Sequence, residues 1–345
     1  MSRADATPHR RLRRRVLSRS AFFAATSALV AWAALVVPMP VVEVVPGEPR
    51  PIEPLVTIEG VDVTELSGTT AILTVSNQRP PPLTTLTAFL DRDRDLTPYH
   101  EVYPPGIDRR EFLRGERERF SRQFDVAAAI GATAAGADTV LVTEVVVVEV
   151  LPGSPADGVL LPGDVVKAAD GEELTAAEQL QHLTREAAVG DELHLTVRRN
   201  GEVLELVAEL DDVTGEGDVR LGVGIETAVD DVELPFEISL VEGIGIGGPS
   251  AGLMVALTVF DLLSDEDLLG HRTVVGTGTL DADGRVGPVG GIPEKMQAAA
   301  AFGADVVLVP QLQLDAAREA APDGLSIIGV ATLDEALDAL RREAI

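Results

Sequence analysis

The chain has 345 residues, enough for two or three domains, and a formal net charge of −28. An acidic surface repels phosphate backbones, and the aromatic content of 3% offers few platforms for base stacking, which argues against nucleic-acid binding. The absence of cysteine excludes disulfides, a cysteine nucleophile and thiolate metal sites. No His-Glu-x-x-His motif occurs and the five histidines are scattered, so neither a metal site nor a cofactor is predicted.

The N-terminal residues combine positive charge with an apolar run. Residues 1–20 form an Arg-rich tail, and residues 21–42 are uncharged, apolar and long enough to span a bilayer as a helix. Pro38 and Pro40 are expected to end the helix early, which leaves about 17 residues, the lower limit of a span. Arg on the N-terminal side predicts a single-pass membrane anchor with a cytoplasmic N-terminus and an extracytoplasmic remainder. A cleaved signal peptide is the alternative, because Ala31-Trp32-Ala33 resembles a cleavage site. The apolar run continues past that site, which favours the anchor.

Residues 43–137 are predicted to be a Pro-rich linker followed by a mixed α/β segment. Strands are expected at Leu55–Ile58 and Thr70–Val75, where apolar residues cluster or alternate. A short helix is expected at Leu83–Leu90 and a longer one over residues 108–130. Nothing in this segment carries identifiable chemistry.

Residues 138–212 have the sequence pattern of a small β-rich domain. A β-branched strand at Val140–Val150 precedes the turn Gly153-Ser154-Pro155-Ala156. A helix is expected from Thr175 to Arg185, with Glu178 as its capping partner, and Asn200-Gly201 is a strong hairpin signal. The segment resembles a bacterial PDZ domain, which implies capture of peptides as an added strand at an exposed sheet edge.

PDZ domains of the kind found in proteases carry a Gly-hydrophobic-Gly loop that receives the peptide carboxylate. No such loop precedes Val140, and the nearest match follows the last strand, at Leu221-Gly222-Val223-Gly224. A circularly permuted domain would use this loop for peptide binding. An ordinary interdomain strand is the alternative, and the sequence leaves both open.

A serine follows a glycine-rich stretch at the start of a strongly apolar helix. The sequence Gly248-Pro249-Ser250 leads into a helix predicted at Ala251–Leu263 and expected to be buried. Free N–H groups at a helix N-terminus suit the oxyanion that forms when a serine attacks a carbonyl. The simpler alternative is that Ser250 only caps the helix.

A lysine stands out because the chain otherwise uses arginine for positive charge. Of 28 basic residues, only Lys167 and Lys295 are lysine. Lysine can lose its proton when desolvated, whereas arginine in effect cannot. Lys295 follows Gly290-Gly291-Ile292-Pro293 in the first turn of a predicted helix, where the helix dipole and burial are both expected to lower its pKa. A serine and a deprotonatable lysine are two of the parts that a serine–lysine hydrolase needs.

With both motifs in place, residues 213–345 resemble the proteolytic domain of the Lon family of serine–lysine peptidases. The resemblance implies that Ser250 is the nucleophile, with Gly248 and Pro249 shaping its turn. It further implies that Lys295 is the base and that Thr277 orients the lysine. The matching residues are Gly248-Pro249-Ser250-Ala251-Gly252, Thr277-Gly278, Gly284-Arg285-Val286, Pro288-Val289-Gly290-Gly291-Ile292, Glu294-Lys295 and Gly303.

The arrangement of anchor, PDZ-like domain and Lon-type domain resembles the membrane-anchored, PDZ-containing Lon-like proteases of bacteria. Such a chain is an α+β multidomain protein that acts on protein or peptide substrates, and Lon-type domains imply a homo-oligomer in the form of a hexameric ring. Two departures matter. No Walker A motif occurs, which predicts ATP-independent proteolysis, and Gly247 replaces an acidic residue present in many Lon enzymes.

The predicted function is therefore an ATP-independent, membrane-anchored serine endopeptidase that cleaves unfolded or extended segments outside the cytoplasm. The alternative is a membrane-anchored PDZ scaffold that binds peptides and has an inactive Lon-like domain. A Ser-His-Asp hydrolase using His271 is also not excluded by the sequence.

Overall fold

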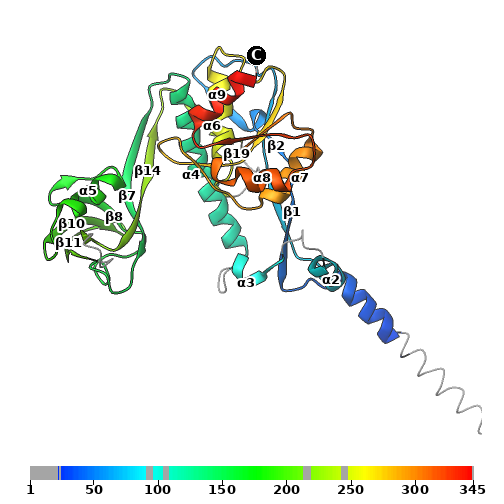
Figure 1. The fold of residues 1–345 in the computed structure, drawn as a ribbon, viewed down its shortest axis with the longest axis horizontal. Coiled ribbons are helices and arrows are strands. Elements are labelled where there is room, and N and C mark those ends of the chain that lie inside the picture. The colour runs from blue at the N-terminus through cyan, green and yellow to red at the C-terminus, as the bar shows by residue number, and fades with distance from the viewer. Residues whose placement is uncertain are drawn as a thin grey trace, which may run out of the picture. The chain divides into compact units, whose positions relative to one another are not determined.

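The computed structural model describes residues 22, 25–90, 96–103, 109–212, 219–241 and 248–343 (Figure 1). The chain forms two compact units. The first comprises residues 1–48 and 74–114, and the second comprises residues 49–73 and 115–345.

The first unit contains a three-stranded antiparallel sheet in the order β5-β1-β6. The expected helix at Leu83–Leu90 is confirmed as α2. The elements of this unit are β1 (Val41–Pro46), β5 (Val75–Gln78), α2 (Pro82–Leu90), β6 (Leu96–Pro98) and α3 (Tyr99–Val102).

The predicted anchor segment, residues 21–42, is helical only up to Val36, and the expectation that Pro38 and Pro40 end the helix early is confirmed. Residues 25–36 are helical, but β1 begins at Val41, and Val42 is buried in the sheet. Pro38 and Pro40 lie between the two elements, and proline both lacks an N–H donor and clashes with the preceding turn of a helix. Among the described residues, no helix is long and apolar enough to cross a membrane. The predicted basic tail, residues 1–20, lies outside the described residues.

The second unit contains a five-stranded sheet in the order β2-β4-β16-β19-β20. Its last four strands are parallel, and only β2 is antiparallel to its neighbour. The strands are β2 (Arg50–Pro51), β4 (Thr69–Ile72), β16 (Thr273–Gly276), β19 (Val306–Pro310) and β20 (Ser326–Val330). Residues from near the N-terminus therefore pair directly with strands from the C-terminal third of the chain.

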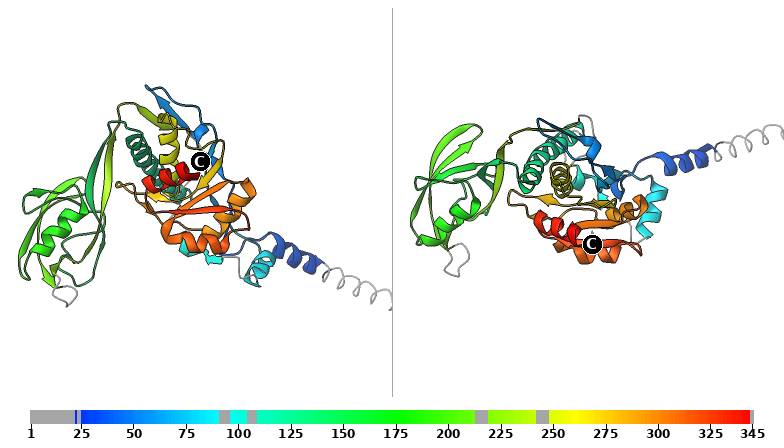
Figure 2. Two further views of the ribbon diagram at one scale, coloured as in Figure 1. Left: turned by 45° about the horizontal axis from the view of Figure 1, so that its top comes forward. Right: turned by 90° about the horizontal axis from the view of Figure 1, so that it is seen from above.

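Helices cover both faces of this sheet (Figure 2). Alternating strand residues divide between two hydrophobic clusters, as the period of a strand requires. One cluster joins Ile72 and Val274 to α4 (Arg109–Ala134), α6 (Gly252–Leu263) and α9 (Leu333–Glu343). The other joins Ala71 and Val275 to α7 (Ile292–Phe302) and α8 (Leu314–Ala320).

Short elements complete this α/β part. The strands β3 (Val56–Glu59) and β15 (Glu237–Leu240) pair with each other, as do β17 (Thr279–Leu280) and β18 (Val286–Gly287). Two 3-10 helices, η1 and η2, span Glu53–Leu55 and Gln311–Gln313. The single strand expected at Thr70–Val75 is wrong, because β4 ends at Ile72 and β5 belongs to the other unit.

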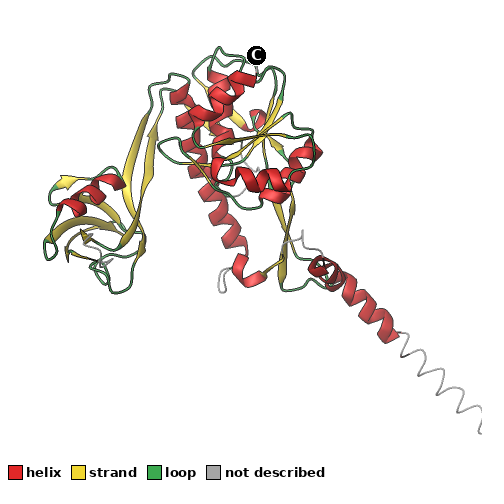
Figure 3. Ribbon diagram, viewed as in Figure 1, coloured by secondary structure: helices red, strands yellow, loops and turns green. Residues whose placement is uncertain are grey.

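The PDZ-like part has its own sheet and core. The strand order is β11-β10-β8-β7-β14, and Figure 3 shows α5 beside these strands. The strand β14, which follows residue 212, pairs with β7 along its length and forms one edge of this sheet. The elements are β7 (Val140–Val150), β8 (Val165–Ala169), β9 (Glu172–Glu173), α5 (Ala177–Glu186), β10 (Glu192–Arg199), β11 (Glu202–Glu209), β12 (Asp211–Asp212), β13 (Val219–Arg220) and β14 (Val223–Glu233).

Local sequence patterns in this part predict the observed strand and turn, but not the cap of α5. Val140–Val150 is the predicted strand, and Asn200 and Gly201 both have positive φ in the predicted hairpin turn. Glu178 does not cap α5. The carboxamide oxygen of Gln179 accepts hydrogen bonds from the backbone N–H groups of Thr175 and Ala176, at 2.7 and 2.8 Å.

Candidate active site

Ser250 lies in a tight turn immediately before α6. Gly248 opens the turn with φ +88°, a conformation that favours glycine, and Pro249 is exposed. The Ser250 carbonyl accepts hydrogen bonds from the Gly278 N–H, at 2.9 Å, and from the Thr277 hydroxyl, at 3.1 Å. The expected helix, and its burial, are confirmed in α6, where every residue from Gly252 to Leu262 is buried. The backbone of the serine is therefore fixed while its side chain stays half-buried.

The absence of a side chain at Gly278 lets the strand segment lie against the serine turn. The Gly278 N–H donates to the Ser250 carbonyl, and the Gly278 carbonyl accepts a hydrogen bond of 3.1 Å from the Leu253 N–H. Gly278 is therefore hydrogen-bonded both to the nucleophile residue and to the first turn of α6. A Cβ at this position would lie 2.6 Å from a methyl carbon of Val286, closer than real Cβ contacts allow. The strand β16 ends at Gly276 and β17 begins at Thr279, and the gap between them presents Thr277 and Gly278 to the serine turn.

Lys295 approaches from the opposite face of the sheet. It lies in the second helical position after Pro293 in α7, and its N–H makes the first helical bond, to the Gly291 carbonyl at 3.0 Å. Its Nζ donates to the Thr277 hydroxyl oxygen at 2.8 Å. Lys295 is only 2% exposed and Thr277 is fully buried. Thr277 thus links the lysine amine to the backbone of Ser250, since it accepts from one and donates to the other.

Burial lowers the pKa of Lys295 to about 8. The side chain forms no ion pair with a carboxylate in the part of the chain that the structure describes, so nothing offsets the cost of desolvating its charge. The other lysine, Lys167, is in the usual environment of a lysine, partly exposed and paired with a carboxylate. It is 41% exposed at its side chain and pairs with Glu144 at 2.9 Å. The two lysines therefore occupy opposite electrostatic environments.

The Ser250 hydroxyl has no hydrogen-bond partner among the described residues, Lys295 Nζ included. Nζ lies within two hydrogen-bond lengths of the Ser250 carbonyl. Catalytic hydrogen bonds are often long or absent without substrate and tighten when it binds.

Two backbone N–H groups are available beside the nucleophile. Within the described part of the chain, neither the Ser250 nor the Ala251 N–H donates to an acceptor, whereas the Leu253 N–H bonds to Gly278. Both free groups lie at the N-terminal end of α6, where the helix dipole also favours negative charge. They are suitably placed donors for an oxyanion.

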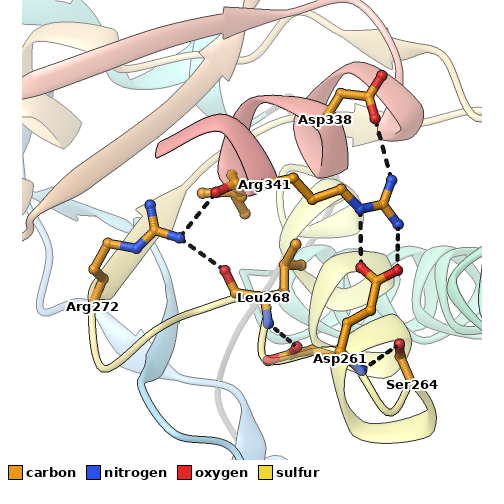
Figure 4. Close-up of polar contacts among 8 residues, drawn as sticks. Asp261, Ser264, Leu268, Arg272, Asp338 and Arg341 are labelled. Atoms are coloured by element: carbon orange, nitrogen blue, oxygen red, sulfur yellow. Dashed lines mark hydrogen bonds and ion pairs between the residues drawn. The ribbon is translucent and has the colours of Figure 1, made fainter. Parts of the chain in front are cut away.

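Polar contacts fix the other end of α6 (Figure 4). The Leu268 N–H donates to the Asp261 carboxylate at 3.3 Å, and Arg341 of α9 forms hydrogen bonds of 2.9 and 3.2 Å with Glu266. Arg272 donates to the Leu268 carbonyl at 2.9 Å. Burial raises the pKa of Asp261 to about 6. These contacts hold the helix that carries Ser250 at its opposite end.

Residues of α4 that sequence reasoning missed lie against the serine turn. The Gly248 N–H points to the Glu116 backbone carbonyl at 3.4 Å, and the Gln123 amide donates to the Leu280 carbonyl at 2.6 Å. The predicted helix over residues 108–130 is confirmed, but no sequence signal indicated which part of the chain it would pack against. The only available clue was the apolar pair Phe120 and Phe124 at helical spacing.

The predicted peptide-binding loop lines a pocket of about 400 Å³ in the PDZ-like part. Leu221, Gly222, Val223 and Gly224 form one wall, and α5 contributes the other. Another pocket, of about 530 Å³, lies between α4 and residues 229–238 and contains none of the predicted catalytic residues. The Gly-Ile loop at residues 243–247, which includes Gly247, lies outside the described residues.

Comparisons with known families agree with both parts. Residues 238–342 match the Lon protease (S16) C-terminal proteolytic domain. Residues 123–210 match the PDZ domain family. One part of the chain is thus similar to PDZ domains and another to the proteolytic domain of Lon proteases, and together with the relatives below these matches support a serine peptidase.

Among curated proteins, Lon protease 2 of Bacillus subtilis is 36% identical over 103 residues, 30% of this chain and 18% of that protein. Lon protease of Rickettsia felis is 36% identical over 93 residues, 26% of this chain and 12% of that protein. The chain therefore spans less than a fifth of the length of these relatives. A solved PDZ domain of an SdrC-like protein from Listeria monocytogenes covers 24% of this chain and 85% of its own, with 21% identity and a TM-score of 0.23.

Proposed function

We propose that this chain is an ATP-independent serine endopeptidase in which Ser250 is the nucleophile and Lys295 the general base. The observation that carries the proposal is the buried lysine, which is hydrogen-bonded to Thr277 beside the serine turn and has no carboxylate partner among the residues that the structure describes. A pKa near 8 leaves a usable fraction of neutral amine at physiological pH. The sequence contains no Walker A motif, which supports a reaction without ATP.

The chemistry follows from these positions. Neutral Lys295 accepts the Ser250 hydroxyl proton as Oγ attacks the scissile carbonyl carbon, and the N–H groups of Ser250 and Ala251 stabilise the oxyanion. The protonated lysine then gives its proton to the leaving amine as the C–N bond breaks. Water attacks the resulting ester with Lys295 again as base, which releases the acid and restores Ser250. Thr277 holds the amine in place between these transfers.

The PDZ domain is proposed to capture extended segments for cleavage. β14 is the outermost strand of its sheet and begins at the loop Leu221–Gly224, so its free edge can accept an added strand. The Ala177 N–H donates to the Thr227 hydroxyl at 2.9 Å, which holds α5 against β14 and bounds the groove. Backbone N–H groups of the glycine-containing loop suit a terminal carboxylate.

Peptide binding tests this role separately from catalysis. A fluorescent apolar peptide with a free C-terminus should bind, and its C-terminal amide should bind at least about tenfold more weakly. Thr184→Glu places a carboxylate in the groove and should abolish binding, whereas His182→Glu, on the exposed face of α5, should not. Equal binding of acid and amide would contradict carboxylate capture.

Membrane attachment and assembly extend the proposal. The large apolar side chains of the helical residues 29–36 are exposed, and the Arg-rich tail precedes them, which supports a single-pass anchor with the catalytic domain outside the cytoplasm. Flotation with lipid vesicles, with and without residues 1–36, tests the anchor and leaves β1 intact. Mass measurement of the catalytic part in solution tests the hexameric ring that resemblance to Lon-type domains implies.

The decisive test of function is cleavage of an unfolded model protein by the full chain, in mild detergent and without ATP. Wild-type protein should cleave, whereas Ser250→Ala and Lys295→Arg should lose cleavage by at least about a thousandfold while remaining folded. Lys167→Arg is the matched control and should cleave normally. A wild-type protein that binds peptides but cleaves none would favour a peptide-binding scaffold instead.

A further inference from the structure

One face of α4 lies along the serine turn and its surroundings. Glu116, Phe120 and Gln123 are spaced i, i+4 and i+7, so their side chains share one face of the helix. Phe120 belongs to the hydrophobic cluster that contains Ala251, and Gln123 bonds to the Leu280 carbonyl. On this face of α4, Glu116 is therefore the residue that lies nearest to the start of the serine turn.

The Glu116 carboxylate is the charged group on this face of α4 that lies beside the serine turn. Its Oε2 lies 3.5 Å from the position that a Cβ on Gly248 would occupy, two residues before Ser250. The Glu116 side chain is 23% exposed, so it is partly desolvated yet reachable from solvent. It forms an ion pair with Arg119 at 2.6 Å on the same helix, and the Arg119 side chain is 57% exposed.

We propose that Glu116 is a specificity residue that favours substrates with a lysine or arginine side chain close to the scissile bond. The inference rests on the proposed function of Ser250. An extended peptide advances about 3.3 Å per residue, so side chains within one or two residues of the attacked carbonyl can reach the neighbourhood of Gly248. A partly desolvated carboxylate attracts a cation more strongly there than in open water.

The partner and the surrounding charge favour the same class of substrate. Arg119 forms an exposed, helical i, i+3 ion pair, which contributes little stability and can be displaced at small cost. The net charge of −28 also attracts cationic polypeptides over longer distances. The structure therefore assigns a cationic, unfolded polypeptide as the preferred substrate.

The side chain of Glu116 can be tested without disturbing the turn. The hydrogen bond from the Gly248 N–H goes to the backbone carbonyl of Glu116, so Glu116→Gln preserves it. The carboxylate makes no hydrogen bond to Ser250, which separates it from the proton transfer. Asp125 offers a matched control because it lies nine residues further along α4, on the opposite face of the helix.

The experiment uses the full chain and internally quenched peptides that differ only in Lys, Gln or Glu at each of the two positions on either side of the scissile bond. Wild-type protein should cleave the best Lys peptide about three- to tenfold faster, in kcat/KM, than its Gln counterpart. Glu116→Gln should remove this ratio, Glu116→Lys should invert it in favour of Glu peptides, and Arg119→Gln should increase it. Asp125→Asn should leave it unchanged, and added salt should reduce it.

Each outcome bears on a different claim. Equal wild-type cleavage of Lys and Gln peptides at every position would overturn the specificity role while leaving the peptidase intact. A Glu116→Gln variant that slows all peptides equally, with the ratio unchanged, would also overturn it and would indicate a positioning role. Failure of wild-type protein to cleave any peptide, or the unfolded model protein, would overturn the proposed function itself.

Discussion

Replacing Lys295 with methionine should stabilise the protein while abolishing catalysis. Methionine has a similar length and no charge, so it can fill the same space without a buried ammonium group. Thr277 keeps a partner, because its hydroxyl still donates to the Ser250 carbonyl. A stabilising substitution at this position would mean that the fold bears an electrostatic cost for the sake of function.

The size of the effect follows from the pKa of Lys295, which burial lowers from 10.5 to about 8. Each pKa unit corresponds to about 1.4 kcal/mol, so protonating the buried amine at pH 7 costs on the order of 3 kcal/mol. The folded state binds fewer protons than the unfolded state between pH 8 and 10.5. Wild-type stability should therefore rise with pH across that window, and the advantage of Lys295→Met should shrink there.

Urea unfolding of wild type and variant at pH 7, 8, 9 and 10 measures this directly. Lys167→Met is the control, because it removes only an exposed ion pair with Glu144 and should cost about 1 kcal/mol or less, with no gain at pH 7. The reasoning is refuted if Lys295→Met is less stable than wild type at pH 7, or if its stability difference does not change between pH 8 and 10.

Three further substitutions probe the site and its support. Thr277→Val should reduce kcat at least about tenfold at pH 7 with little change in KM, because Lys295 loses its hydrogen-bond partner. Gly278→Ala should reduce activity and lower thermal stability, since its Cβ would meet Val286. Asp261→Asn should stabilise the protein by up to about 3 kcal/mol at pH 7, where a carboxyl with a raised pKa is ionised, and the gain should vanish below pH 4 in urea unfolding.

Motifs with local causes could be predicted from the sequence. The serine turn, the buried helix after it, and the helix carrying Lys295 all follow from nearby glycines, prolines and apolar residues. The helix dipole was also expected to lower the pKa of Lys295. In the structure, burial is the cause, and it is nearly complete.

Long-range pairing could not be predicted in the same way. The parallel pairing of β4 with β16 joins residues about 200 positions apart, and no local pattern specifies that partner. For the same reason the sequence did not point to Glu116, which has the pattern of a solvated helix residue. Only the packing of α4 against Gly248 in the structure places its carboxylate near the serine turn. Gln179 rather than Glu178 caps α5 because side-chain direction, and not residue type alone, decides which oxygen reaches the free N–H groups.

The central claim is that Lys295 activates Ser250, and covalent labelling tests it most directly. The full chain would be treated with a peptide fluorophosphonate from pH 6 to 10, and the modified residue located by mass spectrometry. We expect a single adduct on Ser250, with a labelling rate that rises through an apparent pKa near 8 and is lost in Lys295→Met. An adduct on another residue, or Ser250 labelling that is independent of pH and of Lys295, would contradict the account.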